Sequence, residues 1–216
     1  MSSSTTSTNR VEYPRAGNWD IGKGTVDLWT YFPTWNNANY YDLFGCSTTA
    51  AVGDREHVVW KRGNDNTLEV YFSSQTSSGQ YVSWGYANGV SYTQATGQGG
   101  WVDAAWNHVA WTWDTTKGIT IYINGFALSS TTTGPGDGGG DLGPSQVWNP
   151  NFVVGHGNTA NGGWGGGVWP SNSFIDELRI SNIDRYGGTN FTPPSSQYPL
   201  PSTGIRNWML YDQKND

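Results

Sequence analysis

The sequence predicts an all-β fold, in which two antiparallel sheets pack as a jelly-roll sandwich. Many short segments alternate apolar and polar residues, as strands with one buried face do, and turn-forming residues separate them. No stretch shows the 3.6-residue period of an amphipathic helix. Glycine, at 30 of 216 residues, is clustered without a period, which excludes a collagen-like chain and indicates long ordered loops. The length fits one all-β domain.

The first expected strand covers residues 25–32. Its apolar side chains share one face, and these are Val26, Leu28 and Phe32. Asp27 and Tyr31 lie on the opposite face, so the strand should be buried on one side. Farther along the chain, residues 57–61 and 67–72 flank the turn-forming sequence GNDN and predict a hairpin.

The clearest strands form a second hairpin. In its first strand, Val109, Trp111 and Trp113 alternate with smaller or polar residues. In its second strand, the alternating apolar residues are Ile119, Ile121 and Ile123. The Asn-Gly pair at 124–125 then predicts a tight turn. Residues 174–180 form the last expected strand.

Residues 106–114 (WNHVAWTWD) and 119–125 (ITIYING) resemble a hairpin of laminin-G-like domains, W-x-H-V-A-x-T-W-D followed by x-Y-x-N-G. These domains belong to the concanavalin A-like lectin and glucanase superfamily. Residues 174–182 (FIDELRISN) resemble its closing I-D-E-L/V-R-I strand, and residues 185–194 are similar to the ending of versions from bacteriophage virion proteins. The resemblance covers residues 16–194 and implies a concanavalin A-like jelly roll. It leaves the function open, since one fold hosts many activities.

The chain divides into a domain and two arms. Residues 1–15 are rich in Ser and Thr and are expected to form a flexible arm, and residues 16–194 form the domain. Residues 195–216 form a tail that ends in an apolar docking segment. Its expected assembly contacts are Trp208, Leu210 and Tyr211. The sequence leaves open whether they dock on this domain or on a neighbouring chain.

The charge pattern argues against nucleic acid as a partner. The net charge is −6 and no basic run is longer than Lys61-Arg62, whereas nucleic-acid affinity comes largely from basic residues. The single cysteine, Cys46, excludes an intrachain disulfide. No 18-residue apolar run predicts membrane insertion. Residues 1–8 lack the apolar stretch of a signal peptide, so we expect synthesis in a cytoplasm.

Asp176 is the candidate metal ligand. Strict alternation puts it on the same strand face as Phe174, Leu178 and Ile180, so we expect it to be buried. A buried carboxylate needs hydrogen bonds or a cation. Two interpretations stay open: Asp176 accepts hydrogen bonds from loop amides or an indole, or it binds one structural calcium ion together with loop carbonyls. Calcium in related jelly rolls supports the second interpretation by resemblance only.

The carboxylates argue against an enzyme. A retaining glycoside hydrolase needs two carboxyl groups about 5–5.5 Å apart, which the related glucanases place on one strand in an E-x-D-x-x-E-type pattern. This chain lacks that pattern. Asp54 and Glu56 are its nearest candidate pair, while Asp176 and Glu177 should point to opposite faces. We therefore expect no catalytic residues, and we expect His108, which belongs to the fold motif, to be structural.

Two loops rich in aromatic and amide side chains, residues 35–42 and 155–170, are the candidate glycan-binding surfaces. Aromatic rings pack on the apolar C–H faces of sugars, and amides bind their hydroxyl groups. The candidate carbohydrate-binding residues are Trp35, Tyr40, Tyr41, Asn158, Asn161, Trp164 and Trp169. The alternative is that these rings pack the loops down or contact another subunit, since aromatic residues are also enriched at protein interfaces.

These features predict a non-enzymatic virion surface protein, either a capsid decoration protein or a tail-associated one. Its lectin-like jelly roll is a candidate for binding host-surface glycans. The expected partners are virion structural proteins, with a homo-oligomer as a further option. A free-standing carbohydrate-binding lectin is the alternative interpretation, and a polysaccharide-degrading enzyme is the least favoured.

Overall fold

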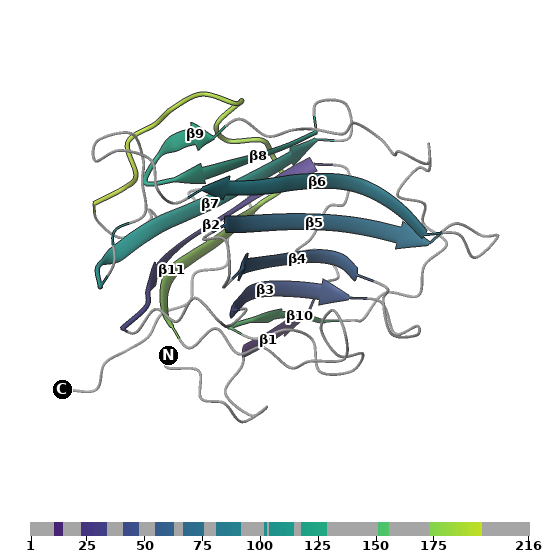
Figure 1. Ribbon diagram of the computed structural model, residues 1–216, viewed down its shortest axis with the longest axis horizontal. Coiled ribbons are helices and arrows are strands. Elements are labelled where there is room, and N and C mark those ends of the chain that lie inside the picture. Colours follow the sequence, from purple (N-terminus) through teal and green to yellow (C-terminus); the bar gives the residue numbers. More distant parts are fainter. Residues whose placement is uncertain are drawn as a thin grey trace.

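Two antiparallel sheets pack face to face, which confirms the predicted all-β jelly-roll sandwich (Figure 1). The computed structural model describes residues 11–14, 23–33, 41–47, 55–62, 67–75, 81–91, 102, 104–114, 118–128, 151–155 and 173–195. Within these residues no helix is long and apolar enough to span a membrane.

Six strands form the larger sheet, and every neighbouring pair is antiparallel. In spatial order they are β1 (Val11–Pro14), β10 (Asn151–Val154), β3 (Tyr41–Ser47), β4 (Arg55–Arg62), β5 (Thr67–Gln75) and β6 (Tyr81–Ser91). β4 and β5 form the expected hairpin, with Arg62 opposite Thr67.

β1 corrects the boundary of the expected N-terminal arm. Val11 pairs with Val154 of β10, and the ring of Tyr13 stacks on Phe152 at a centroid distance of 5.4 Å. An apolar pair of side chains therefore draws this segment into the sheet, and the sandwich begins inside residues 1–15. Residues 1–10 lie outside the described residues.

Five strands form the second sheet, again with antiparallel neighbours. In spatial order they are β11 (Phe174–Ser181), β2 (Lys23–Tyr31), β7 (Trp106–Asp114), β8 (Gly118–Ile123) and β9 (Phe126–Leu128). The expected tight turn joins β8 to β9, and both of its residues, Asn124 and Gly125, have positive φ, at 50° and 82°. Such a turn matches the twist of a two-residue hairpin and explains the Asn-Gly sequence.

The hydrophobic core lies between the sheets and uses the faces that alternation predicted. Its fully buried members on the five-stranded sheet include Val26, Leu28, Val109, Trp111, Ile121 and Leu178. Phe44 of β3 contacts Trp111 of β7 edge to face at 5.6 Å and stacks with Phe152 of β10 at 5.4 Å. Large aromatic side chains therefore pack the two sheets together. The outer face of the five-stranded sheet points away from this core.

Candidate functional site

The outer face of the five-stranded sheet carries the polar and aromatic side chains that face away from the core. On β2 these are Thr25, Asp27, Trp29 and Tyr31, because alternate residues share a face. This face has two halves, one around Asp27 and one around Tyr31, and β11 and β7 flank β2 in both halves. The two halves differ in what covers them.

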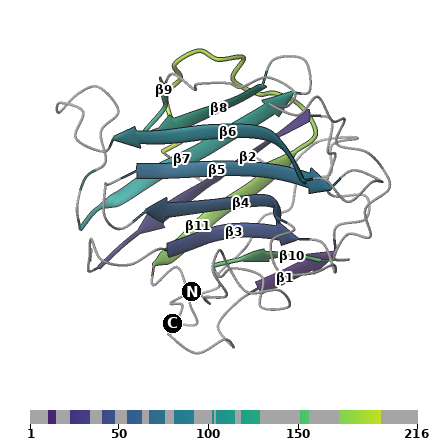
Figure 2. The same ribbon diagram turned by 45° about the vertical axis from the view of Figure 1, so that its right-hand side comes forward.

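The chain that follows β11 covers the Asp27 half, and we call residues 183–194 the strap. The strap runs past β8 and β9 in Figures 1 and 2, where it is drawn in yellow-green. At its start, Thr25 Oγ1 donates to the carbonyl of Ile183 at 2.7 Å and accepts from the amide of Arg185 at 3.0 Å. These bonds tie the strap to β2.

The far end of the strap is held by β8, β9 and the turn between them. The amide of Gly188 donates to Tyr122 Oη at 2.9 Å, and the amide of Phe191 donates to the carbonyl of Gly125 at 2.8 Å. In return, Asn190 Oδ1 accepts from the amide of Ala127 at 2.9 Å. The strap thus crosses the sheet from β2 to its far edge.

Aromatic rings fill the space under the strap. Tyr186 and Phe191 stack in parallel at 3.6 Å, and Tyr122 meets both rings edge on, at 5.2 and 5.5 Å. Phe191 also meets the ring of His108 at 5.5 Å. These contacts hold the strap against the sheet by apolar burial as well as by hydrogen bonds.

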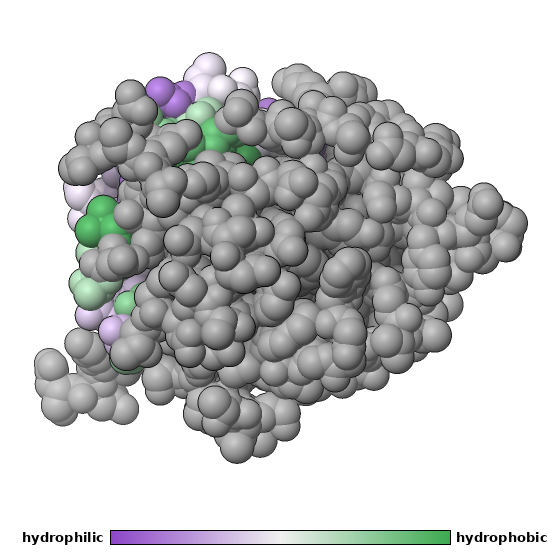
Figure 3. Space-filling view, in the orientation of Figure 1, coloured by the Kyte–Doolittle hydropathy of each residue, from purple (hydrophilic) through white to green (hydrophobic). Residues whose placement is uncertain are grey.

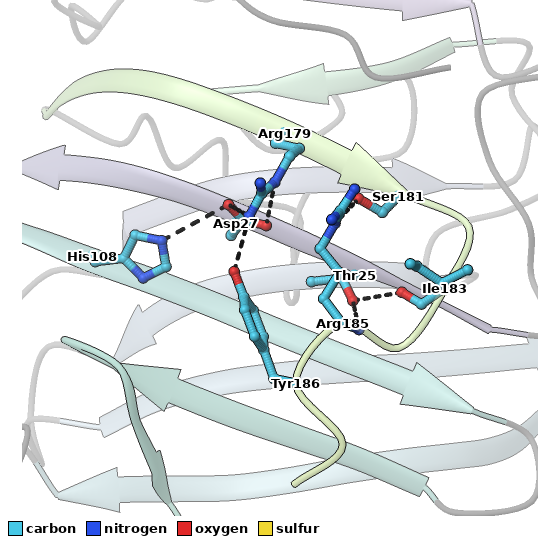
Figure 4. A network of polar contacts seen from close by, with 8 residues as sticks. All are labelled: Thr25, Asp27, His108, Arg179, Ser181, Ile183, Arg185 and Tyr186. Atoms are coloured by element: carbon cyan, nitrogen blue, oxygen red, sulfur yellow. Dashed lines mark hydrogen bonds and ion pairs between the residues drawn. The ribbon is translucent and has the colours of Figure 1, made fainter. Parts of the chain in front are cut away.

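Asp27 is the buried carboxylate of this site (Figure 4). Its side chain is 0% exposed, and Arg179 of β11 contacts both of its oxygens, with Nη2 at 3.0 Å and Nε at 3.1 Å. His108 Nε2 lies 3.8 Å from Oδ1. A two-point contact with a guanidinium is the geometry that best compensates a buried carboxylate. Asp27 and Arg179 therefore join β2 to β11.

Tyr186 connects the strap to this ion pair. Arg179 Nη2 donates to Tyr186 Oη at 3.0 Å. Burial, followed by the negative charge of Asp27, raises the pKa of Tyr186 far above its ordinary value, and Arg179 only partly offsets this. The phenol therefore stays neutral, and its hydrogen bond with Arg179 holds the strap against the ion pair. His108, 0% exposed below Phe191, takes the structural position that its motif predicted.

Asp176 is exposed, so the expectation that it is buried was wrong. The pairing of β11 with β2 shifts between Asp176 and Arg179, and Glu177 at this bulge has a φ of +51°. One extra residue reverses the alternation, so Phe174 and Asp176 lie on the outer face while Leu178 faces the core. Asp176 Oδ1 accepts a hydrogen bond from the amide of Glu177 at 2.8 Å.

The half of the outer face around Tyr31 carries a line of three rings, which we call the aromatic row: the exposed Phe174 and Trp106, with the half-buried Tyr31 between them. Tyr31 lies 6.0 Å from Phe174 and 5.8 Å from Trp106, and both pairs are tilted. Phe174 is 40% exposed and Trp106 is 46% exposed. Figure 3 shows hydrophobic surface along its left-hand edge, the side on which β7 begins in Figure 1.

Of the predicted loop and tail residues, the structure describes only the backbone of Tyr41. Those outside the described residues are Trp35, Tyr40, Asn158, Asn161, Trp164, Trp169, Trp208, Leu210 and Tyr211. Tyr41 lies in β3, where only its backbone is described. The two loops join the described structure next to the aromatic row, since one leaves after Pro33 and the other enters at Ser173. In the part of the chain that the structure describes, no three His, Cys, Asp or Glu side chains gather as a metal site.

Sequence reasoning missed both the buried ion pair and the aromatic row. It placed Asp27 and Tyr31 on the face away from the core, but nothing local to β2 indicates that a chain segment more than 150 residues later covers one of them and leaves the other open. The usable signals were Arg179, a cation on the last expected strand, and the rings of Tyr186 and Phe191 just beyond it.

No family model and no curated protein matches this chain. Among solved structures it is similar to a phenylalanine-to-alanine mutant of HCR/D, with a TM-score of 0.53 and 16% identity over 86% of this chain and 39% of that one. It is also similar to a structure concerning botulinum neurotoxin type C, whose cell entry depends on two ganglioside molecules, with a TM-score of 0.52 and 13% identity over 82% and 38%.

A third similar structure is the botulinum neurotoxin serotype D ligand binding domain in complex with N-acetylneuraminic acid, with a TM-score of 0.50 and 16% identity. There the match covers 82% of this chain and 37% of the other, so this chain spans less than two fifths of each of these three chains. The shared architecture is a two-sheet jelly roll. This chain therefore has a concanavalin A-like fold.

Proposed function

We propose that this chain is a non-enzymatic, lectin-like domain that binds glycans and is displayed on a virion surface. The observation that carries the binding role is the division of the outer sheet face. The ionisable groups of one half, Asp27, His108 and Arg179, lie close to one another beside the strap, while the other half presents the aromatic row and the exposed Asp176. Such a surface is suited to recognition rather than to acid–base chemistry.

The structural neighbours support a glycan as the ligand. One is a domain in complex with N-acetylneuraminic acid, and another concerns a toxin whose cell entry depends on gangliosides. The predicted loop residues Trp35, Trp164 and Trp169 add aromatic side chains of the kind that stack on sugars. A structural calcium ion on Asp176 is the alternative use of this exposed carboxylate, since a bound cation would occupy its oxygens and leave none for a sugar.

The test of binding is a glycan array with the purified protein, read once with calcium and once with a chelator. We expect saturable binding to a defined set of glycans, and loss of the signal with chelator would assign the calcium ion a role. Silence in both conditions would overturn the binding role. Release of reducing ends from a polysaccharide that disappears in Glu56→Gln would instead indicate a polysaccharide-degrading enzyme. Saturable glycan binding that is lost in Trp164→Ala, by a protein that does not assemble into virions, would indicate a free-standing lectin.

The virion location rests on the similarity of residues 185–194 to the ending of phage virion versions of this domain. In the structure this ending belongs to the strap, which packs on the five-stranded sheet. We propose that the tail docks on virion structural proteins of the capsid or the tail through Trp208, Leu210 and Tyr211, after synthesis in the host cytoplasm.

Deletion of residues 204–216 tests that docking role. We expect the truncated protein to keep its melting temperature, because the described core ends before the deletion, and to be lost from particles that incorporate the full chain. Sedimentation of assembled particles followed by immunoblotting measures the incorporation. Incorporation at the full-length level would contradict the docking role of the tail.

A further inference from the structure

We infer that the aromatic row is a subsite for neutral pyranose rings, an inference that rests on the proposed glycan-binding function. The row consists of Phe174 on β11, Tyr31 on β2 and Trp106 on β7, and these three strands are neighbours in the sheet. Tyr31 pairs with both of the others, so the rings form one continuous line across the sheet.

Backbone pairing holds the row in place before any ligand arrives. Trp106 begins β7 and is further fixed by the buried Asn107, whose Oδ1 accepts from the amide of Val102 at 2.8 Å. Asn107 Nδ2 donates to the carbonyls of Val102 and Ala105 at 2.9 and 3.0 Å. Asn124 Nδ2 in turn donates to Asn107 Oδ1 at 3.1 Å. Rings on a rigid scaffold lose little conformational entropy on binding.

The rim of the row is polar, which favours a sugar over an apolar partner. The described contacts give no hydrogen bond to the Tyr31 hydroxyl or to the Trp106 indole N–H, and Asp176 uses only one of its oxygens, for the amide of Glu177. The rings, together with a hydroxyl, an indole N–H and a carboxylate oxygen that form no hydrogen bond within the described residues, match a pyranose, which has an apolar C–H face and a ring of hydroxyl groups.

The charge of the site selects a neutral glycan. Asp176 is exposed on the same strand face as Phe174, two residues away, and opposite Trp29. No ion pair to Asp176 is formed within the described residues, and the whole chain carries a net charge of −6. A carboxylate beside the rings accepts hydrogen bonds from sugar hydroxyls and repels an acidic sugar. The site therefore differs in ligand class from N-acetylneuraminic acid, which is an acid.

The experiment compares the wild-type chain with Trp106→Ala and Phe174→Ala on an array that carries neutral glucan, mannan and galactan oligosaccharides beside sialylated ones. We expect wild type to bind neutral oligosaccharides and each variant to bind them about tenfold or more weakly, because each removes a stacking ring. Trp106→Phe should restore most of the binding. Ile183→Ala is the matched control, since Ile183 is 40% exposed, as Phe174 is, but lies on the strap.

The outcomes separate this inference from the function on which it rests. If wild type binds glycans and both row variants bind them equally well, the aromatic row is not the subsite, while the glycan-binding function still holds. Binding of sialylated glycans alone would overturn the charge argument. Absence of all glycan binding would remove the function and the row together. A dimer of wild type that Trp106→Ala converts to monomer, measured by sedimentation velocity, would make the row a protein interface and overturn the subsite.

Discussion

Replacing Arg179 with methionine should lower the free energy of unfolding by about 3–5 kcal/mol, because it leaves a buried carboxylate without its cation. Asp27 is 0% exposed, and Arg179 contacts both of its oxygens. Arg179 also donates to Tyr186, so the strap loses a hydrogen bond at the same time. Methionine keeps much of the apolar stem, and the change therefore reports on charge more than on packing. Urea unfolding followed by tryptophan fluorescence measures the loss.

Two controls show whether the buried charge causes the loss. The double variant Asp27→Asn with Arg179→Met removes both charges and should recover part of the stability, since no ion is then left buried. Lys23→Met removes an exposed cation at the start of the same β2 strand and should change the stability by less than about 1 kcal/mol. If Arg179→Met behaved like Lys23→Met, the ion pair would have no role in holding the sheet.

Gly125→Ala should release the strap and cost roughly 2–5 kcal/mol, as the sum of backbone strain and overpacking. Gly125 has a φ of +82°, and an added Cβ would lie 2.0 Å from the carbonyl oxygen of Phe191 and 2.7 Å from Cδ of Pro193. The hydrogen bond from the Phe191 amide to Gly125 could not form with the strap displaced. We expect a lower melting temperature and new proteolytic cleavage within residues 183–194.

Gly187→Ala is the matched control for this substitution. Gly187 also has positive φ, at +57°, but an added Cβ there meets no atom within 4 Å. It should show only the backbone strain, about 1–2 kcal/mol. Equal losses in the two variants, with no cleavage of the strap, would mean that Gly125 serves the turn alone and does not hold the strap.

The parts of the fold that depend on local pattern could be predicted from the sequence. Alternation placed Val109, Trp111 and Trp113 in the core, and the Asn124-Gly125 turn lies between β8 and β9 as expected. In both cases the residues that carry the pattern are close together in the chain. The strands β1, β3 and β10 have weaker patterns, and partners from distant parts of the chain determine them.

The error at Asp176 has a local cause that sequence alone does not reveal. Glu177 adopts a left-handed conformation, which glycine and asparagine favour and glutamate does not. The resulting bulge turns Asp176 outward and leaves Leu178 in the core. A buried carboxylate does need a partner, and among the described residues the buried carboxylate is Asp27. Its partner Arg179 is 152 residues away in sequence, and no local pattern connects them.

The hydrogen bond between Asn190 and Ala127 has a consequence for how copies of this protein can associate. β9 is an edge strand of the sheet, and in a three-residue antiparallel strand the middle amide points away from its only partner. Asn190 Oδ1 accepts from that amide, so the free edge offers no donor to the strand of another molecule. The strap thus protects this edge against sheet extension and aggregation. We therefore do not expect a homo-oligomer to extend the sheet at β9.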